Sequence, residues 1–342
     1  MEDRPVLRSR QVKRPTIHDV AAAAGVSRGT VSRLLNGDKY VSPAARVAIE
    51  RAISETGYVV NRAARSLVTQ RTGSVVMVLS EPYEKLFEDP NYSTLIRVAI
   101  KMLAERDLSL VMMLAGDAAE RERVVRYVRG GHADGVLLVS THAGDPLVEA
   151  LGSGPPAVSF GAVIGHENVI PYAAADERLG ARQMTEYFVA QGRRRIAMIT
   201  GPMDTPGGIQ RLEGFAEVLG RKATSKLIAH GDWTQASGER AMAELLERTP
   251  DLDAVFVASD LMAAGALAAL RAAGRSVPGD VAVGGFDDSS VAVTTHPPLT
   301  TIRQPLTEMA QETVRLLLAL IDGAGDPEPV ILPTELVIRE SA

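Results

Sequence analysis

Three short segments near the N-terminus repeat apolar residues at the spacing of an amphipathic helix. The apolar positions are Ile17, Val20, Ala21 and Ala24 in the first segment, Val31, Leu34 and Leu35 in the second, and Ile49, Ala52 and Ile53 in the third. Within each set the residues share one helical face, so each helix can bury that face against the other two. The pattern predicts a small three-helix domain over residues 16–60.

Polar residues and glycines mark the ends of these helices. Thr16 and Asp19 form a capping-box variant at the start of the first helix. Ser27 can cap the second helix, and Ser42 precedes Pro43 at the start of the third. Glycines follow the helices at positions 25, 37 and 57. The tight Ala-Gly-Val-Ser connection between the first two helices predicts a helix-turn-helix.

The second helix, expected over residues 28–36, has a polar face without acidic residues. That face carries Arg28, Gly29, Thr30, Ser32 and Arg33. Guanidinium groups read guanine edges in the major groove, and small hydroxyls contact phosphates. We therefore expect this helix to read DNA; the alternative is a small helical module that binds another protein.

From residue 74 onward the spacing of apolar residues changes, and short apolar runs alternate with amphipathic segments. The expected strands are Ser74–Leu79, Ser109–Met113, Gly135–Val139, Ile196–Thr200, Ala254–Val257 and Val281–Gly284, and the expected helices include Ser93–Arg106, Arg178–Gln191 and Leu261–Ala273. This alternation predicts doubly wound α/β lobes with parallel sheets. Ligands of such lobes bind at the carboxyl ends of the strands.

Charge divides the chain in the same place as the periodicity does. Residues 1–72 hold 13 Lys and Arg against 6 Asp and Glu, whereas the other 270 residues hold 24 against 36. The net charge of −5 therefore conceals a basic head on an acidic body. A basic tail over residues 1–15 and a basic helical domain are what a DNA-binding domain would produce, but charge alone fits a solvated basic tail equally well, and the helix-turn-helix pattern decides between them.

Several functional classes are disfavoured by what the chain lacks. Cysteine is absent, which excludes disulfides, thiolate zinc sites and cysteine nucleophiles. The sequence contains no phosphate loop, zinc signature or nucleophile elbow, so we expect neither an enzyme nor a bound cofactor. The first residues are polar, and no apolar run is long enough to cross a membrane, so a cytoplasmic protein is expected.

The run from Thr16 to Leu67 resembles the head of the LacI/GalR repressors. Shared features in register include Gly-Val-Ser, Thr-Val-Ser-Arg, Leu-Asn-Gly and Asn-Arg-Ala-Ala-Arg-Ser-Leu. The resemblance implies that Arg28, Gly29 and Arg33 read base edges. It also implies backbone contacts from Ile17, His18, Ser27, Thr30, Ser32, Asn36, Ser42 and Asn61.

The resemblance further implies a hinge at residues 61–72. Its short helix is too short to be stable alone in water and would fold on DNA. Ala64 and Leu67 would lie in the minor groove, with Leu67 wedged between base pairs at a central CG step. Val60 stands where the family often has proline, so the entry to the hinge is expected to be more flexible.

The body resembles the two-lobed periplasmic-binding-protein-like core of the same family. The implied fold is an N-terminal all-α helix-turn-helix plus this α/β core of doubly wound parallel sheets. The N-lobe is expected at about 73–172 and 306–333, and the C-lobe at about 173–303 and 334–342. The implied effector residues are Tyr92, Arg211, Trp233, Ser259, Asp260, Asp287 and Gln304. Charged groups beside an aromatic ring suit a polyol such as a sugar.

Three departures from the family pattern bear on the ligand. Ser259 replaces a frequent asparagine, Gly161 replaces a carboxylate of some sugar-responsive members, and the segment 81–92 carries extra residues. Together with the reading helix they resemble the cellobiose-responsive branch. The expectation is a repressor of sugar-utilisation genes that cellobiose or a cello-oligosaccharide releases from a palindromic operator.

Other interpretations stay open at this point. The effector could be a purine or another corepressor that strengthens DNA binding, or a phosphoprotein could bind the body. A protein of a different class, a sugar-binding protein without a regulatory role, would share the body but lack the head. No heptad tail follows residue 339, so we expect a homodimer on double-stranded DNA.

Overall fold

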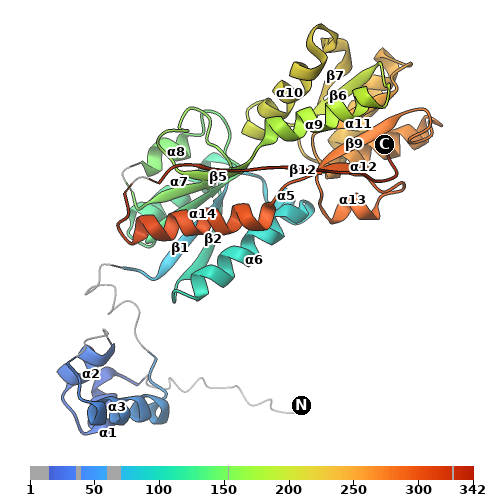
Figure 1. The fold of residues 1–342 in the computed structure, drawn as a ribbon. Coiled ribbons are helices and arrows are strands. Elements are labelled where there is room, and N and C mark those ends of the chain that lie inside the picture. The colour runs from blue at the N-terminus through green and yellow to red at the C-terminus, as the bar shows by residue number, and fades with distance from the viewer. Residues whose placement is uncertain (1–14, 36–39, 60–70, 153, 326) are drawn as a thin grey trace, which may run out of the picture. The chain divides into compact units, whose positions relative to one another are not determined.

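The computed structural model describes residues 15–35, 40–59, 71–152, 154–325 and 327–342. The chain forms two compact units, residues 1–72 and residues 73–342. Each unit is described by itself (Figure 1).

The first unit is a three-helix domain composed of α1 (Ile17–Ala24), α2 (Arg28–Leu35) and α3 (Pro43–Thr56). The Asp19 carboxylate accepts hydrogen bonds from the backbone N–H and the hydroxyl of Thr16, at 2.7 and 2.8 Å. Gly25 ends α1 with φ 65°, a conformation that glycine adopts without strain. Val20, Val31 and Ile49, one from each helix, form the buried centre of this domain.

The second unit contains two six-stranded sheets, one in each of two lobes. The N-lobe strands are β1 (Ser74–Leu79), β2 (Ser109–Leu114), β3 (Gly135–Val139), β4 (Ala157–Phe160), β5 (Tyr172–Ala175) and β11 (Val330–Leu332). The C-lobe strands are β6 (Ile196–Thr200), β7 (Ile228–His230), β8 (Ala254–Val257), β9 (Ala282–Asp287), β10 (Thr300–Arg303) and β12 (Glu335–Val337). The sheet orders are β11-β5-β4-β3-β1-β2 and β12-β10-β9-β8-β6-β7. Every pairing among these described strands is parallel except that of β10 with β12, so the doubly wound parallel architecture is confirmed.

Helices cover both faces of each sheet. The N-lobe helices are α5 (Tyr83–Glu88), α6 (Pro90–Ala104), α7 (Ala118–Arg129), α8 (Pro146–Leu151) and α14 (Leu306–Ile321). The C-lobe helices are α9 (Glu177–Ala190), α10 (Pro206–Leu219), α11 (Gln235–Arg248), α12 (Asp260–Ala272) and α13 (Ser290–Thr294), with short 3₁₀ turns at Gly220–Lys222 and Ser225–Leu227. In the N-lobe, α6 and α14 pack together on one face, and α7 and α8 cover the other. In the C-lobe, α9 packs with α10 and α11 with α12 around one large apolar core.

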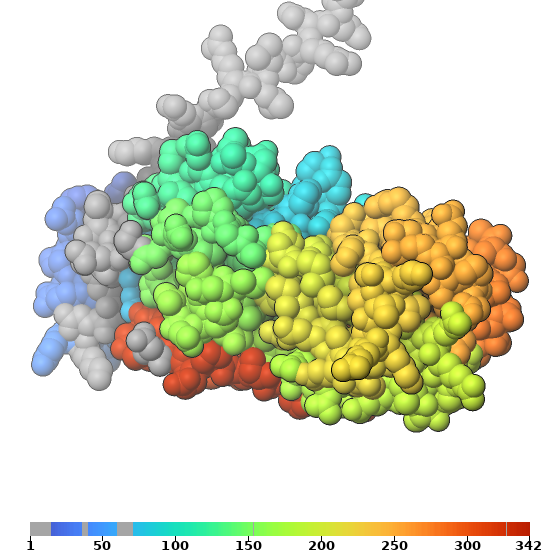
Figure 2. Space-filling model, turned by 90° about the horizontal axis from the view of Figure 1, so that it is seen from above, coloured from blue at the N-terminus to red at the C-terminus, as the bar shows by residue number. Residues whose placement is uncertain are grey.

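The chain passes between the lobes three times (Figure 1), and the lobes lie against each other in the space-filling view (Figure 2). The first passage follows β5 at Asp176, the second joins β10 to α14 through Gln304, and the third lies between Pro333 and Thr334. The first lies later than the boundary expected at residue 172. The reason is that β5 pairs with β4 and β11 and so belongs to the N-lobe sheet.

The apolar runs of the sequence correspond to real strands. A strand occupies each of the six predicted positions, and only β2 and β9 extend beyond their predicted ends. Among the described residues, no helix has the length and hydropathy needed to cross a membrane.

Candidate DNA-reading helix and effector pocket

Helix α2 presents an exposed basic face. Arg28, Gly29 and Arg33 are exposed, while Val31 is fully buried against α1 and α3. The Arg33 Nε donates to the carbonyl of Gly29 at 3.3 Å, so this side chain lies along its own helix. The burial of Val31 therefore turns the basic face of α2 outward.

The residues expected at the phosphate backbone lie mostly at helix N-termini. The Ser27 hydroxyl accepts from the Thr30 N–H at 3.1 Å, and the Ser42 hydroxyl accepts from the Ala45 N–H at 3.3 Å. The positive ends of α2 and α3 thus lie beside exposed hydroxyls, an arrangement that suits phosphate. Ser32 is half-buried on α2.

Ile17 and His18 stand in the first turn of α1 but differ in their surroundings. Ile17 is partly buried and packs against the apolar core of the domain. Its backbone N–H, in the first turn, can still contact a phosphate. The His18 side chain is exposed. Asn36, Asn61, Ala64 and Leu67 lie outside the described residues, and their roles stay predictions.

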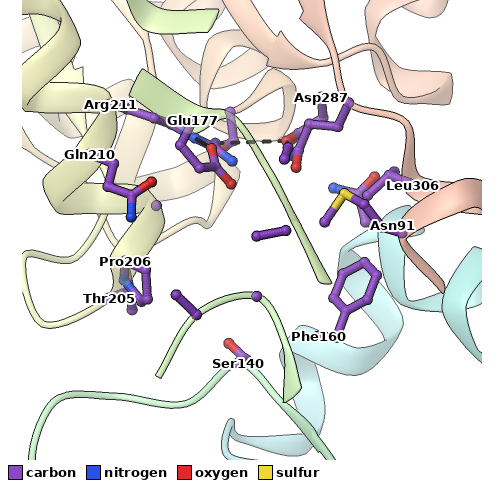
Figure 3. Close-up of a pocket in the computed structure, with 18 of the residues that line it drawn as sticks. Asn91, Ser140, Phe160, Glu177, Thr205, Pro206, Gln210, Arg211, Asp287 and Leu306 are labelled. Carbon is purple, nitrogen blue, oxygen red and sulfur yellow. Dashed lines mark hydrogen bonds and ion pairs between the residues drawn. The ribbon is translucent and has the colours of Figure 1, made fainter. Parts of the chain in front are cut away.

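The second unit holds a cavity of about 470 Å³ between its two lobes. Figure 3 shows side chains of both lobes pointing into it, with Arg211 and Gln210 on one wall and Asn91 and Leu306 on the opposite one. The first turns of five helices contribute to the lining, those of α6, α9, α10, α12 and α14. In doubly wound lobes the carboxyl ends of strands and the amino ends of helices face the same crevice, which explains this convergence.

An ion-pair cluster forms the C-lobe wall of the cavity. The Arg211 Nε donates to Glu177 Oε2 at 2.5 Å, and the Arg211 Nη1 lies 3.7 Å from Asp287 Oδ1. The same Nη1 donates to the carbonyl of Ala258. Gln304 Nε2 donates to Asp287 Oδ1 at 2.6 Å. One buried guanidinium therefore orders two carboxylates in the cavity wall (Figure 3).

Burial changes the acidity of this cluster. It raises the pKa of Asp287 well above its usual range; Arg211 opposes this effect, and the nearby carboxylates of Asp260 and Asp89 add to it. The pKa of Arg211 is raised although burial alone would lower it, because Glu177 and Asp287 stabilise the cation. The cluster thus places a permanent positive charge beside carboxyl groups that can accept hydrogen bonds.

Aromatic rings enclose the Arg211 guanidinium. Its central carbon lies 3.7 Å from the centroid of Phe286 and 5.3 Å from the centroid of Trp233. The Trp233 ring lies over Gly201, where an added Cβ would come within 2.0 Å of the ring. Glycine at this position is therefore required for the tryptophan to reach the cavity.

Six of the seven residues expected at the effector meet at this cavity. Tyr92, Arg211, Trp233, Ser259, Asp287 and Gln304 all line it. Ser259 also caps α12, since its hydroxyl accepts from the Met262 N–H at 3.2 Å. Gly161 lines the cavity as well, with φ 92°, and no atom lies within 4 Å of the point that a Cβ would occupy there. The lack of a side chain at Gly161 therefore leaves space in the cavity wall.

Asp260 does not belong to the cavity wall, and this corrects the expectation from sequence. It is fully buried, and its carboxylate accepts from the Thr301 hydroxyl at 2.6 Å and the Ser289 N–H at 2.8 Å. Burial raises its pKa to about 7. Asp260 therefore joins α12 to β10 and to the start of α13 and is not turned toward a ligand.

Other lining residues were not anticipated from the sequence. They include Asp89, Asn91, Ser140, Phe160, Glu177, Thr205 and Gln210. Asp89 and Thr205 cap α6 and α10, and Glu177 opens α9. Their positions just after a strand or at a helix start were a usable signal, because that edge of each lobe faces the crevice.

Tyr92 connects the cavity to a second polar group. Burial raises the pKa of its hydroxyl, and the nearby Ser140 side chain opposes this effect. Ser140 in turn donates to Glu81 Oε1 at 2.8 Å. The aromatic residue expected from sequence thus lies beside the Ser140–Glu81 pair at the end of β3.

Comparisons with known proteins agree with this architecture. Residues 16–61 match the bacterial regulatory proteins of the lacI family, and residues 185–342 match the periplasmic binding protein-like domain. The chain is 48% identical over 335 residues to the HTH-type transcriptional regulator CelR of Thermobifida fusca, covering 96% of this chain and 98% of that protein.

Two solved structures extend the comparison. One is described as a transcriptional regulator CelR–cellobiose complex, with TM-score 0.77, 45% identity, and coverage of 96% of this chain and 100% of that one. The other is the Lac repressor dimer bound to operator and the anti-inducer ONPF, with TM-score 0.83, 27% identity, and coverage of 96% and 99%. The chain therefore belongs to the LacI family of bacterial transcriptional regulators, which bind DNA and are not enzymes.

Proposed function

We propose that this protein represses sugar-utilisation genes and is released from a palindromic operator by a neutral sugar, cellobiose or a cello-oligosaccharide. The observation that carries the proposal is the buried Arg211–Glu177–Asp287 cluster beside Trp233, inside a cavity between two lobes. Such a wall offers donors and acceptors to hydroxyls, and a ring face to the apolar side of a pyranose.

The charge of the cavity supports a neutral ligand. Five carboxylates line it, those of Asp89, Asp176, Glu177, Glu213 and Asp287. The two arginines in the lining are already paired, Arg211 with Glu177 and Arg178 with Glu217. The lining therefore holds more carboxyl groups than cations and offers no unpaired arginine to a phosphate, which favours an unphosphorylated sugar.

Similarity supports the choice of sugar. The CelR structure that covers this whole architecture is described as a complex with cellobiose. The cavity volume of about 470 Å³ falls within the range of small-molecule sites. Gly161 adds room in the cavity wall, as expected for a ligand larger than a monosaccharide.

The DNA-binding half of the proposal rests on α2. Arg28, Gly29 and Arg33 would read base edges, and the N-termini of α2 and α3 would contact phosphates. A homodimer would place two such helices on the half-sites of a palindrome, with the hinge residues 61–72 at its centre. The Lac repressor dimer on its operator supports this assembly. A regulator of this kind would work in the cytoplasm, where it meets the chromosome.

The proposed release is a shift between two arrangements of the lobes. Without sugar, the N-lobes of the dimer would hold the two hinges close enough to fold on DNA. A sugar that contacts Arg211 and Trp233 on the C-lobe and Tyr92 on the N-lobe would favour one arrangement of the lobes. The hinge helices would then separate and melt.

Operator binding measured by fluorescence anisotropy tests the proposal. The operator would be a G-rich palindrome with a central CG step, and cellobiose, glucose, maltose and guanine would be titrated at constant salt. Release by cellobiose but not by maltose, which differs in its glycosidic linkage, is the expected result. Tighter operator binding in the presence of guanine would show that the effector is a corepressor and not an inducer. No response to any sugar would refute the assignment of a sugar effector.

A further inference from the structure

We propose that His142 and Asp204 form a proton-dependent latch between the two lobes beside the effector cavity, and that this latch sets effector affinity. The proposal rests on the proposed function only for the ligand used in its test. The two residues come from different lobes, since His142 follows β3 and Asp204 follows β6.

The latch consists of two contacts that cross from one lobe to the other. His142 Nδ1 lies 2.9 Å from Asp204 Oδ2, and the Ala143 N–H donates to the Asp204 carbonyl at 2.7 Å. Both ends of the latch adjoin the cavity. Ser140 and Thr141, which line the cavity, directly precede His142 in the chain, and Thr205, which also lines it, directly follows Asp204 (Figure 3). Opening the lobes would therefore break these contacts as it exposes the cavity.

The other ring nitrogen of His142 faces a second carboxylate. His142 Nε2 lies 3.2 Å from Glu81 Oε1, and Glu81 is 2% exposed. Lys85 of α5 donates to the other oxygen of Glu81 at 2.9 Å, and Ser140 donates to Oε1. These partners of Glu81 all belong to the N-lobe, so they would stay with His142 when the lobes separate.

The geometry requires a protonated imidazole. A neutral imidazole donates from one nitrogen only, so one of the two carboxylates would face a lone pair. The imidazolium donates to both. The pKa of His142 agrees with a protonated ring. The hydrogen bond to Glu81 raises this pKa although burial opposes it, and Asp204 raises it further. The pKa of Glu81 is lowered because its contacts with His142 and Lys85 outweigh burial.

Of the two carboxylates that contact His142, only Asp204 belongs to the other lobe. In separated lobes His142 would keep Glu81 but lose Asp204, so its pKa is higher in the closed arrangement than in the open one. Closure is then favoured at a pH below the open-state pKa, and this advantage disappears as the pH rises through the closed-state pKa. The side chain of Asp204 is 53% exposed and that of His142 25%, so solvent screens the pair and the effect is modest.

The latch is also connected to the ligand wall. Ser140 lines the cavity, and its hydroxyl donates to Glu81, the same carboxylate that His142 contacts. A sugar that contacts Ser140 would therefore touch a residue that shares Glu81 with the latch.

Cellobiose titrations of the full chain, followed by fluorescence, test the latch. Trp233 is the only tryptophan and lines the cavity, so its signal reports binding there. Between about pH 5.5 and pH 8 we expect the wild-type Kd to rise about two- to fivefold more than that of Asp204→Asn. The pH dependence is compared between wild type and variant because protonation of Asp287, whose pKa is also raised, can change the cellobiose affinity of both proteins in the same way.

Two further variants complete the design. His142→Gln should share the reduced pH dependence of Asp204→Asn. His132→Gln should keep the wild-type dependence, because His132 is exposed at the opposite end of β3. Equal pH dependence in wild type, Asp204→Asn and His142→Gln would overturn the latch.

A failure of the latch is distinguishable from a failure of the proposed effector. If cellobiose produces no saturable Trp233 signal at any pH, the choice of effector is wrong. Histidine side-chain NMR of the protein without ligand then decides the latch. The expected result is a lower pKa of His142 in Asp204→Asn than in wild type, and an unchanged pKa would overturn the proposal.

Discussion

Replacing Arg211 by methionine removes the cation of the cavity wall and keeps a similar side-chain length. The Arg211 side chain is 6% exposed, and those of its partners Glu177 and Asp287 are 13% and 8% exposed. Removing one partner of a buried ion pair costs about 3–5 kcal/mol, because the remaining charge stays buried without compensation. We expect Arg211→Met to lower the free energy of unfolding of the second unit by an amount in this range.

The same substitution removes hydrogen bonds that a sugar would use. A hydrogen bond that involves a charged group contributes about 1.5–3 kcal/mol, so cellobiose affinity should fall about ten- to a hundredfold. Operator affinity without sugar should stay near the wild-type value, because the substitution changes the ligand wall and no residue of the DNA-reading unit 1–72. The variant is therefore expected to bind operator and to need about ten- to a hundredfold more cellobiose for release.

The stability loss should depend on pH in a defined direction. The pKa of Asp287 is already raised by burial, and without Arg211 it rises further. A carboxyl group whose pKa is raised in the folded state stabilises that state below its unfolded pKa, and this contribution is lost as the pH rises through the folded pKa. The stability difference between Arg211→Met and wild type should therefore shrink as the pH falls from neutral toward the ordinary range of an aspartic acid.

Urea unfolding followed by circular dichroism measures the stability, and operator anisotropy with added cellobiose measures the response. Arg182→Met is a matched control, since Arg182 lies on exposed α9 surface with side-chain exposure of 47%. It should change stability by less than about 1 kcal/mol. Arg211→Met combined with Glu177→Gln should recover part of the stability but none of the sugar response. Release of Arg211→Met from operator at wild-type cellobiose concentrations would refute the assignment of the cavity.

Three further substitutions test separate parts of the structure. Gly201→Ala would place a Cβ within 2.0 Å of the Trp233 ring, so the ring must move; fluorescence should show a shifted emission and a cellobiose affinity at least about tenfold weaker, and an unchanged affinity would exclude a stacking role for Trp233. Asp260→Ala leaves the Ser289 N–H and the Thr301 hydroxyl without their acceptor, so urea unfolding should show a free energy of unfolding lower by about 1–3 kcal/mol. A loss of sugar affinity without a loss of stability would instead show that Asp260 contacts the ligand. Arg33→Ala should reduce discrimination at one operator base pair by about 1–3 kcal/mol in competition anisotropy while leaving cellobiose binding intact, and equal weakening on all sequences would identify Arg33 as a phosphate contact.

Much of the head domain could be predicted because its signals are local. The caps at Thr16, Ser27 and Ser42 and the glycine at position 25 act within one helical turn, and the structure contains each helix where these residues predict it. The strands of the body were equally readable, since fully buried parallel strands appear as short apolar runs. The passage between lobes after β5 was placed too early because strand pairing, which decides it, joins residues far apart in the chain.

The candidate site was only partly predictable. Arg211 and Asp287 could be proposed by resemblance, but the role of Glu177 depends on a contact across 34 positions of the chain. Asp260 and Asp287 look alike as sequence, both being aspartates at a strand or helix boundary. The structure separates them, because the Thr301 hydroxyl and the Ser289 N–H occupy one carboxylate and the cavity lies beside the other.

The sequence by itself determined the three helices of the head, the alternation of strands and helices in the body, and the basic and acidic division between them. Each of these follows from local periodicity, capping or composition, which act over a few residues. Only the tertiary structure decided which side chains share the cavity and that His142 meets Asp204 across the lobes, 62 positions away. Such contacts depend on how two sheets and three interlobe passages place distant residues, and no short-range pattern encodes that placement.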